Sequence, residues 1–583
     1  DRPLKTTRYL GSYSLDIKLP VDGLKFRSNL GIDARTVQDY EFRSAETSNR
    51  GMGTSYAKNA VDKYTMFTLE NMLFYDKTFN DKHTLGVTLL QSIQEDKKEN
   101  VNVAMENLPA DNLKYYDLGS GLVTNTIGSS MIKWNMASFM GRINYNYLGR
   151  YLLTVSARYD GSSRLADGHK WVLFPSAALA WRINEESFMS STSGWLDNLK
   201  LRLGFGKTGN SAVDPYQTKG TLSLIRYPFD NGGTPTIGYA PNAMANSLLT
   251  WETTDQWNLG IDFGVLRGRI NGTIDLYMQN THDLLLKRQL PVVSGFPDVL
   301  SNVGKTRNKG IEVSINSMNI NSKDFQWTTD LMLSSNKEEI VELYNGKNDD
   351  IGSKWFIGQP VNVHYDYRKV GIWQNTESDL AEMAKFAANG TEFAPGDIKI
   401  QDVNGDYKIT DADKQILGNP RPKLIASMVN TFNYKGFDLS VFLYASFGAM
   451  LYNDIYALEH CGRNGGVKVD YWTPNNPTNA YPRPSIDEER PIYITSTYYE
   501  KADFLRVKTM TLGYTLPKTL TNKFLVEKLR VYFTAQNPFI FTNYTGIDPE
   551  AAKVNSAGNP ETNGSGFGTP SVSSWIFGIN LTL

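Results

Sequence analysis

The pattern in this sequence with the best spacing for chemistry is a run of oxygen-bearing residues from Asp402 to Asp413. A calcium loop takes side-chain oxygens from its first, third and fifth positions, a backbone carbonyl from its seventh and a carboxylate from its twelfth. Those positions are occupied here by Asp402, Asn404, Asp406, Lys408 through its carbonyl group, and Asp413. The match is incomplete, because Tyr407 stands where calcium loops have glycine and Asp413 is shorter than the usual glutamate. The run therefore predicts either a calcium site or an Asx-rich turn that binds no ion.

A second run, Gly204-Phe205-Gly206-Lys207-Thr208-Gly209, matches the G-x-G-x-x-G pattern of nucleotide-binding loops. Such a loop needs a strand before it and a helix after it. Here a strand-like alternation leads into a polar segment, and Leu201 stands where a phosphate loop needs its first glycine. The run is therefore interpreted as the end of a strand.

The residues of common catalytic sites are scattered. The five histidines have no H-E-x-x-H spacing, and the pair His460-Cys461 has no identifiable orienting group. Because Cys461 is the only cysteine, neither a disulfide nor a cysteine metal site is expected. We therefore predict that the protein is not an enzyme. Aromatic residues in the loops could stack on sugars, but packing of the loops against each other is favoured for Trp373, Tyr471, Trp472, Tyr481, Tyr498 and Tyr499.

Bulk composition narrows the class of protein. The chain has 583 residues and a formal net charge of −1, which gives no case for a nucleic-acid partner. It contains no apolar run of about 18 residues, so we expect no transmembrane helix. No signal peptide is present at Asp1, and we expect that a preceding segment has been removed or is missing.

The elements that must position these residues are strands. Between Ser138 and Asp160 two segments alternate apolar and polar side chains on either side of the turn Leu148-Gly149-Arg150. Each has about ten residues, the length with which a tilted strand crosses a bilayer, and tyrosines stand at the ends of the apolar stripe. Repeats of this pattern predict about 17 strands, in which short turns alternate with long loops. The fold class predicted is an all-β transmembrane antiparallel barrel, with a soluble all-β protein as the alternative.

The long loops are expected outside the cell and the short turns in the periplasm. We expect a polar loop over residues 38–63, a loop over residues 209–249, and a large extracellular loop over residues 337–423 that carries the Asp402 run. Within a domain of residues 1–583, this last loop is the largest irregular stretch.

Several short stretches, in order along nearly the whole chain, resemble the SusC/RagA-like branch of the TonB-dependent outer-membrane transporters. They include Leu199 to Asn210, Trp251 to Leu285, Asn302-Val303-Gly304, Gly371-Ile372-Trp373-Gln374, Pro395-Gly396-Asp397-Ile398, Ile416-Leu417-Gly418-Asn419-Pro420, Tyr471-Trp472-Thr473-Pro474, Phe504-Leu505-Arg506-Val507-Lys508, Gln536-Asn537-Pro538 and Tyr544-Thr545-Gly546-Ile547-Asp548-Pro549-Glu550.

The resemblance implies a barrel of about 22 strands in the outer membrane of a Gram-negative bacterium. It also implies import of large nutrients, either glycan or peptide oligomers, with a plug inside the barrel, a TonB box and a SusD-like surface lipoprotein as a lid. This chain corresponds to the C-terminal part of such a barrel, so the plug and first strands are expected from a missing segment or a separate chain. The alternatives are a surface or soluble glycan-binding β protein without transport, and a passive porin.

Overall fold

The computed structural model describes residues 1–47, 53–227, 229, 236–453, 468–485, 491–524, 526–550 and 571–583. His460 and Cys461, the adjacent pair considered above, lie outside the described residues. Within these ranges the helices are all too short or too polar to cross a membrane.

Seventeen strands belong to one sheet, as the sequence predicts, and every register recorded within it is antiparallel. The chain divides into two compact units, which are described separately. Unit 1 comprises residues 1–186, 201–258 and 279–305, and unit 2 comprises residues 187–200, 259–278 and 306–583. The boundary falls within β8 (Leu196–Asn210), β11 (Glu252–Val265), β12 (Ile270–His282) and β15 (Lys305–Asn321).

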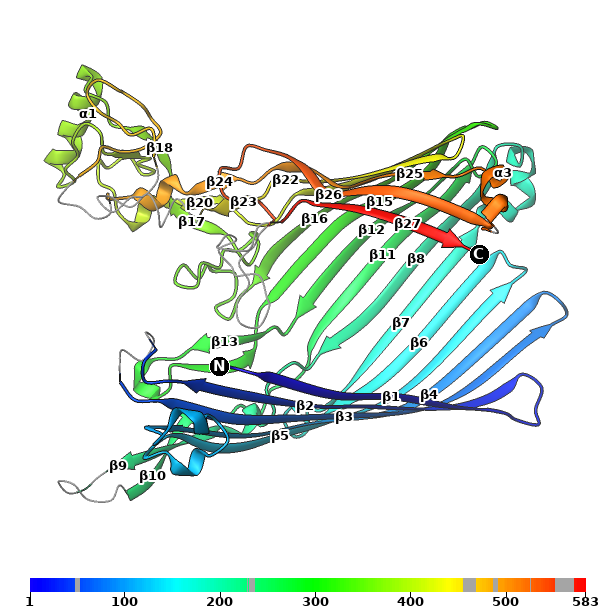
Figure 1. Ribbon diagram of the computed structural model, residues 1–583, viewed down its shortest axis with the longest axis horizontal. Coiled ribbons are helices and arrows are strands. Elements are labelled where there is room, and N and C mark those ends of the chain that lie inside the picture. Colours follow the sequence, from blue (N-terminus) through cyan, green and yellow to red (C-terminus); the bar gives the residue numbers. More distant parts are fainter. Residues whose placement is uncertain are drawn as a thin grey trace. The chain divides into compact units, whose positions relative to one another are not determined.

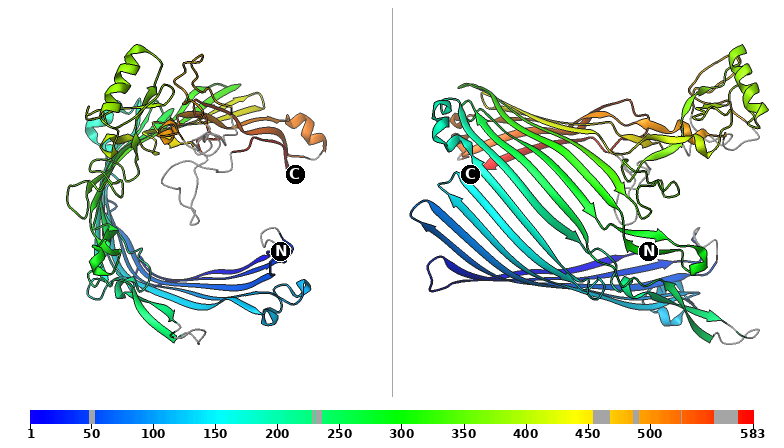
Figure 2. Two further views of the ribbon diagram at one scale, coloured as in Figure 1. Left: turned by 90° about the vertical axis from the view of Figure 1, so that its left-hand side faces the viewer. Right: turned by 180° about the vertical axis from the view of Figure 1, so that it is seen from behind.

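Unit 1 is built on seven strands that pair in the order of the chain (Figures 1 and 2, blue to cyan). They are β1 (Leu4–Lys18), β2 (Leu24–Arg43), β3 (Tyr56–Phe79), β4 (His83–Glu106), β5 (Val123–Tyr147), β6 (Tyr151–Ser162) and β7 (Trp171–Arg182). The hairpin at Ser138–Asp160 is confirmed, with Ser138 opposite Asp160 and Tyr147 opposite Tyr151. Its turn places Leu148 and Gly149 at φ values of 56° and 69°, the left-handed conformation that tight hairpins use. Two short hairpins also belong to the unit: β9 (Thr221–Tyr227) with β10 (Thr236–Ala243), and β13 (Leu285–Gln289) with β14 (Asp298–Asn302).

Two bands of aromatic rings cross one face of this sheet. We call it the apolar face; on β6 it carries Tyr151, Leu153, Val155, Ala157 and Tyr159, and it includes the side chains of neighbouring strands on the same side. At one end Tyr147, Tyr151 and Trp181 stack in series, with centroid distances of 6.3 and 6.5 Å. At the other end Trp171 stacks on Tyr159 at 4.9 Å and on Phe139 at 6.3 Å. The bands are about 26 Å apart along β6, which matches the height of the apolar band of an outer-membrane barrel.

The polar loop expected over residues 38–63 is mostly wrong, because β2 continues to Arg43 and β3 begins at Tyr56. The strand β4 is similarly long and continues to Glu106. On β4 the apolar face changes character within one strand: Leu89 and Ile93 give way to Glu95, Lys97 and Glu99. Strand pairing continues past this change because backbone hydrogen bonds do not depend on whether the flanking side chains are apolar.

Unit 2 holds a second run of paired strands: β16 (Phe325–Glu342), β21 (Leu424–Tyr434), β22 (Phe437–Phe447), β25 (Phe504–Thr515), β26 (Lys528–Thr542) and β27 (Ser574–Thr582). Because β16 ends at Glu342 and β21 begins at Leu424, the segment between them is slightly shorter than the predicted loop of residues 337–423.

That segment is folded, not irregular. It contains β17 (His364–Tyr367), β18 (Lys369–Ile372), the helix α1 (Glu377–Ala388), β19 (Ile398–Ile400) and β20 (Lys414–Gly418). Thr376 caps α1 by accepting a hydrogen bond from the Asp379 backbone N–H, and Gly390 at φ 87° follows its end. Residues 470–485 and 491–501, the second of which includes β24 (Tyr499–Lys501), pack against it, and we call residues 364–418 with these two stretches the loop module (Figure 1).

Candidate functional site

The core of the loop module joins stretches that lie about a hundred residues apart. Ile372, Ile398, Ile400, Trp472, Ile494 and Tyr498 form one buried cluster. Trp472 donates a hydrogen bond from Nε1 to Oε1 of Gln374 at 2.8 Å. The stretches Gly371–Gln374, Pro395–Ile398 and Tyr471–Pro474, noted in the sequence separately, thus form one structural unit.

Trp373 is the centre of a second cluster with Met383 and Phe386 of α1. Its backbone N–H donates to the Asp397 carbonyl at 2.9 Å, and its carbonyl accepts from the Gly396 N–H at 2.7 Å. The Lys399 ammonium lies 4.0 Å from the centre of the indole ring and pairs with Asp379 at 3.2 Å. Strand, turn and helix are therefore fixed to one another around a single buried ring.

Packing, the interpretation favoured for the loop aromatics, is confirmed for the three that are almost fully buried, Trp373, Trp472 and Tyr498. Tyr471 is the exception, with 46% of its surface exposed. Tyr499 is half-buried and donates to Asp366 at 3.0 Å; burial, with the adjacent carboxylate, raises the pKa of its hydroxyl.

The Asp402–Asp413 run is closed by its own hydrogen bonds. The two carboxylate oxygens of Asp402 accept from the backbone N–H groups of Gly405 at 2.7 Å and Tyr407 at 2.8 Å. Asp406 accepts from the Lys408 N–H at 2.8 Å and from the Asn404 side chain at 2.9 Å. Asp413 is fully buried and accepts from the N–H groups of Val403 and Thr410 at 2.9 and 2.8 Å.

Tyr407 adopts φ 56°, so the sixth position of the run has the left-handed backbone that glycine supplies in calcium loops. Its ring packs edge-on against Phe386 at 5.5 Å, and this contact offsets the cost of the conformation. The oxygen donors are chemically suited to calcium. Within the described ranges, however, no three or more His, Cys, Asp or Glu side chains are grouped as metal ligands, and calcium stays a prediction.

The glycine-rich run at Gly204–Gly209 lies entirely within β8, which extends to Asn210, so its interpretation as the end of a strand is confirmed. The Nζ atom of Lys207 lies 3.8 Å from the Oδ1 atom of Asp255.

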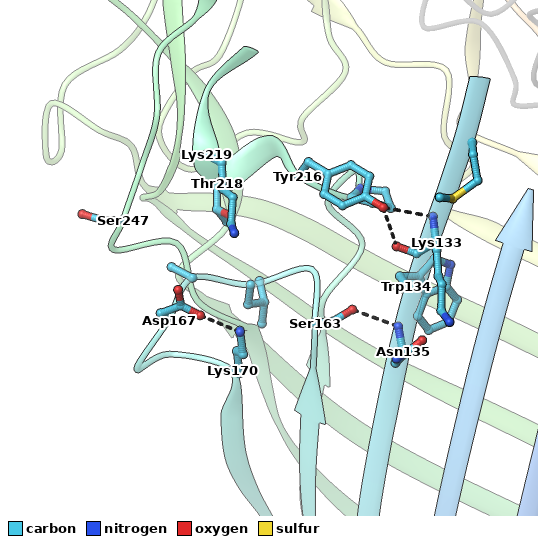
Figure 3. Close-up of a pocket in the computed structure, with 14 residues that line it drawn as sticks. Lys133, Trp134, Asn135, Ser163, Asp167, Lys170, Tyr216, Thr218, Lys219 and Ser247 are labelled. Atoms are coloured by element: carbon cyan, nitrogen blue, oxygen red, sulfur yellow. Dashed lines mark hydrogen bonds and ion pairs between the residues drawn. The ribbon is translucent and has the colours of Figure 1, made fainter. Parts of the chain in front are cut away.

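A hollow of about 490 Å³ lies in unit 1 beside the part of β5 around Lys133 (Figure 3). Its walls come from β5, the β6–β7 connection, the segment before β9 and, at Ser247, the segment between β10 and β11. Three ammonium groups line it, from Lys133, Lys170 and Lys219, with the single carboxylate Asp167. Asp167 pairs with Lys170 at 2.5 Å, and Lys133 pairs with Glu95 at 2.9 Å. The indole of Trp134 and the phenol of Tyr216 complete a site suited to an anionic group on a larger molecule. No local sequence pattern predicts this hollow, because its walls come from four separate segments.

Comparison with known proteins places this geometry in context. The family profile described as TonB dependent receptor-like, beta-barrel, matches residues 2–537. The TonB-dependent receptor P3 of Formosa agariphila is 32% identical over 581 residues, which cover 96% of this chain and 56% of that protein. The TonB-dependent receptor SusC of Bacteroides thetaiotaomicron is 35% identical over 434 residues, which cover 71% of this chain and 41% of SusC. This chain thus spans about half the length of the curated relatives it matches.

Among solved structures, one described as the RagAB peptide transporter superposes with a TM-score of 0.83 at 21% identity. The match covers 100% of this chain and 62% of that one. At this identity the likeness establishes the fold.

Proposed function

The chain belongs to the family of TonB-dependent receptor-like β-barrels, and from this membership we propose that the whole protein imports large nutrients, either glycan or peptide oligomers. It is an outer-membrane β-barrel protein of a Gram-negative bacterium, which sets aside the alternative of a soluble sheet protein. The proposal includes a SusD-like lipoprotein as the lid, and energy supplied by TonB.

The observation that carries the proposal is the match to TonB-dependent receptors along 96% of this chain. Two features of the fold support it. The apolar face with its two aromatic bands suits lipid, and the loop module supplies a folded surface at the end of the strands where a partner or cargo can bind.

A transport assay in the native host tests the proposal. Cells with and without the gene receive fluorescent oligosaccharides and oligopeptides, in the presence and absence of a proton uncoupler. We expect gene-dependent uptake that the uncoupler abolishes. Gene-dependent uptake that survives the uncoupler would instead identify a passive porin. Mass spectrometry of the complex, purified in mild detergent, should identify a copurifying lipoprotein and any trapped cargo.

We further propose that calcium binds the Asp402–Asp413 run and stabilises the loop module. The spacing of its oxygen donors and the left-handed backbone at Tyr407 support this role.

A further inference from the structure

β5 of unit 1 has an edge that is unpaired over part of its length. β5 pairs with β4 along its whole length, from Val123 to Tyr147, but its pairing with β6 begins only at Met136. Residues 123–133 therefore extend beyond β6, and every one of them is exposed. The described part of the chain provides no strand on this side.

The register shows which backbone groups point outward from this edge. In an antiparallel pair, alternate residues direct both N–H and C=O away from the partner strand. Asn135 and Lys133 do so, because their backbone groups bond to Ser163 and Tyr216. By the same alternation Met131, Ser129 and Ile127 direct theirs outward, and no hydrogen bond from the described residues reaches them.

The composition of this edge differs from that of protected edges. Natural sheets blunt exposed edges with charges, proline or bulges. Residues 123–132 read Val-Thr-Asn-Thr-Ile-Gly-Ser-Ser-Met-Ile, with neither a charge nor a proline, and the register shift in this pair lies at Asn125, before the stretch from Ile127 to Met131. Ile127 and Met131 are 71% and 54% exposed. Such a segment favours pairing with another strand.

The hollow beside Lys133 adds charge to the end of this edge. In Figure 3 the Tyr216 hydroxyl reaches Lys133 on β5, where it accepts from the backbone N–H and donates to the carbonyl, both at 3.3 Å. It thus makes the pair of bonds that a neighbouring strand would make. Beyond it stand Lys219 and Lys170; because Lys133 pairs with Glu95 and Lys170 with Asp167, Lys219 supplies the excess positive charge of the hollow.

We propose that the free edge of β5 from Ile127 to Met131 binds an extended peptide of the cargo as an added strand, with an acidic residue of that peptide near Lys219. Main-chain hydrogen bonds would supply the affinity and make the site tolerant of sequence, as in other strand-addition sites. The lysines would select peptides with an acidic residue next to the paired stretch. This inference rests on the proposed import function and narrows its substrate class to peptides.

The test measures binding to the full-length transporter, purified with its copurifying partners. The probe is a fluorescent decapeptide that alternates Thr and Val and ends in two Asp residues. Its counterpart carries N-methyl groups on alternate amides, which block strand pairing but keep every side chain. We expect the methylated peptide to bind about tenfold more weakly or worse, because it loses several hydrogen bonds. Equal binding of the two peptides overturns the proposal, as does preferential binding of an acidic oligosaccharide, tetragalacturonate.

Two pairs of variants locate the site. Ser129→Pro removes an outward N–H, and proline is tolerated on edge strands, whereas Ser129→Ala keeps that N–H. Only Ser129→Pro should weaken peptide binding. Lys219→Gln should weaken binding of the acidic peptide but not of its Asn analogue, while Lys347→Gln, an exposed lysine in unit 2, should change neither. Unchanged binding by a well-folded Ser129→Pro protein overturns the edge assignment, and the methylated peptide provides the same test if that variant does not fold.

Failure of this inference can be told apart from failure of the proposed function. If cells import the peptide in an uncoupler-sensitive way and Ser129→Pro leaves uptake unchanged, import stands and the edge site is wrong. If wild-type cells show no gene-dependent import of any oligomer, the import function itself is wrong, whatever the purified protein binds. If the unmethylated probe is displaced by a purified lipoprotein segment but not by cargo peptide, the edge belongs to a partner and the proposal is wrong.

Discussion

Arg506 and Asp548 form a buried ion pair in unit 2, with Nη2 and Oδ1 2.6 Å apart and each side chain about 5% exposed. Arg506 lies on β25, and Asp548 lies in the connection that follows β26. Glu550 contacts the Nε of the same guanidinium and pairs with Lys508 at 2.7 Å. Two sequence motifs, Phe504–Lys508 and Tyr544–Glu550, therefore form one charged cluster. Burial alone would raise the pKa of Asp548, but hydrogen bonds from the Glu550 and Ser571 backbones and the charge of Arg506 lower it.

Replacing Arg506 should destabilise this region severely. Arg506→Met leaves the buried Asp548 carboxylate without its ion-pair partner and deprives Glu550 of one of its two cations, and we expect a loss of about 3–5 kcal/mol in the free energy of unfolding. Chemical denaturation of the purified protein measures it. The matched control is Arg2→Met, which breaks an exposed pair with Asp39 and should leave the midpoint nearly unchanged. Equal effects of the two substitutions would contradict the importance of burial.

Lys369 should make the loop module more stable at alkaline pH. Burial lowers the pKa of Lys369 to about 8. The unfolded chain, with an ordinary lysine pKa, therefore binds more protons than the folded one between about pH 8 and pH 10, so the free energy of unfolding rises with pH across that window. Lys369→Met should remove this slope and raise stability at pH 7, whereas Lys347→Met should keep the slope. Tryptophan fluorescence during denaturation at pH 7 and 9.5 measures both, and a slope that persists in Lys369→Met would refute the assignment.

Gly396 should tolerate no side chain. It has φ 94°, and a Cβ atom there would lie 2.5 Å from the Trp472 ring. Gly390 has a similar φ of 87°, but open space surrounds it. Gly396→Ala and Gly390→Ala thus carry the same backbone strain, about 1 kcal/mol or more, and differ in the clash. We expect faster hydrogen exchange at the Trp373 amide in Gly396→Ala only. Equal exchange in both variants would show that the packing around Trp472 accommodates the added methyl group without loss of stability.

Calcium should raise the melting temperature of the loop module if it binds the Asp402 run. Millimolar calcium is the relevant range for extracellular sites, whose dissociation constants are about 0.1–1 mM. Asp402→Ala should abolish the increase. Asp411→Ala, in the same run but outside the five ligand positions, should retain it. Identical melting with calcium and with chelator in the wild-type protein would leave the run as a hydrogen-bonded turn.

A charge in the middle of the apolar face should hinder membrane insertion. Val155 stands midway between the aromatic bands on β6, and Thr154 lies on the opposite face. Val155→Arg should cost about 2–4 kcal/mol, the penalty of arginine at the bilayer midplane. Thr154→Arg should cost much less. The yield of protein in the outer membrane, with denaturant titration in lipid, measures the difference, and equal yields would mean that this face does not contact lipid.

The sequence predicts the membrane-type hairpins well, because alternation and turn residues are local signals. The turn at Leu148-Gly149 and the number of strands follow from them. The extent of β2 to β5 does not, because their outer portions mix polar and apolar side chains on each face and so lack the regular alternation on which the prediction depends. The helix α1 had a usable signal, with Thr376 as cap and Gly390 at its end, but it lies inside a stretch interpreted as one loop. The contacts of Trp472 with Gln374 and of Arg506 with Asp548 join distant segments, and no local pattern specifies such partners.

The change from apolar to charged side chains along β4 determines how deeply the protein sits in the membrane. The strand has 24 residues, about twice what a bilayer requires, so its ends cannot decide how deeply the protein sits. The position at which Glu95 follows Ile93 on this face does decide the depth. Sinking by a single two-residue step would draw a carboxylate toward hydrocarbon, and rising by the same step would lift the Tyr151 ring out of the headgroup layer. The positions of Glu95 and Tyr151 therefore set the depth of the protein in the bilayer, and a membrane of different thickness would have to adapt its thickness around the barrel.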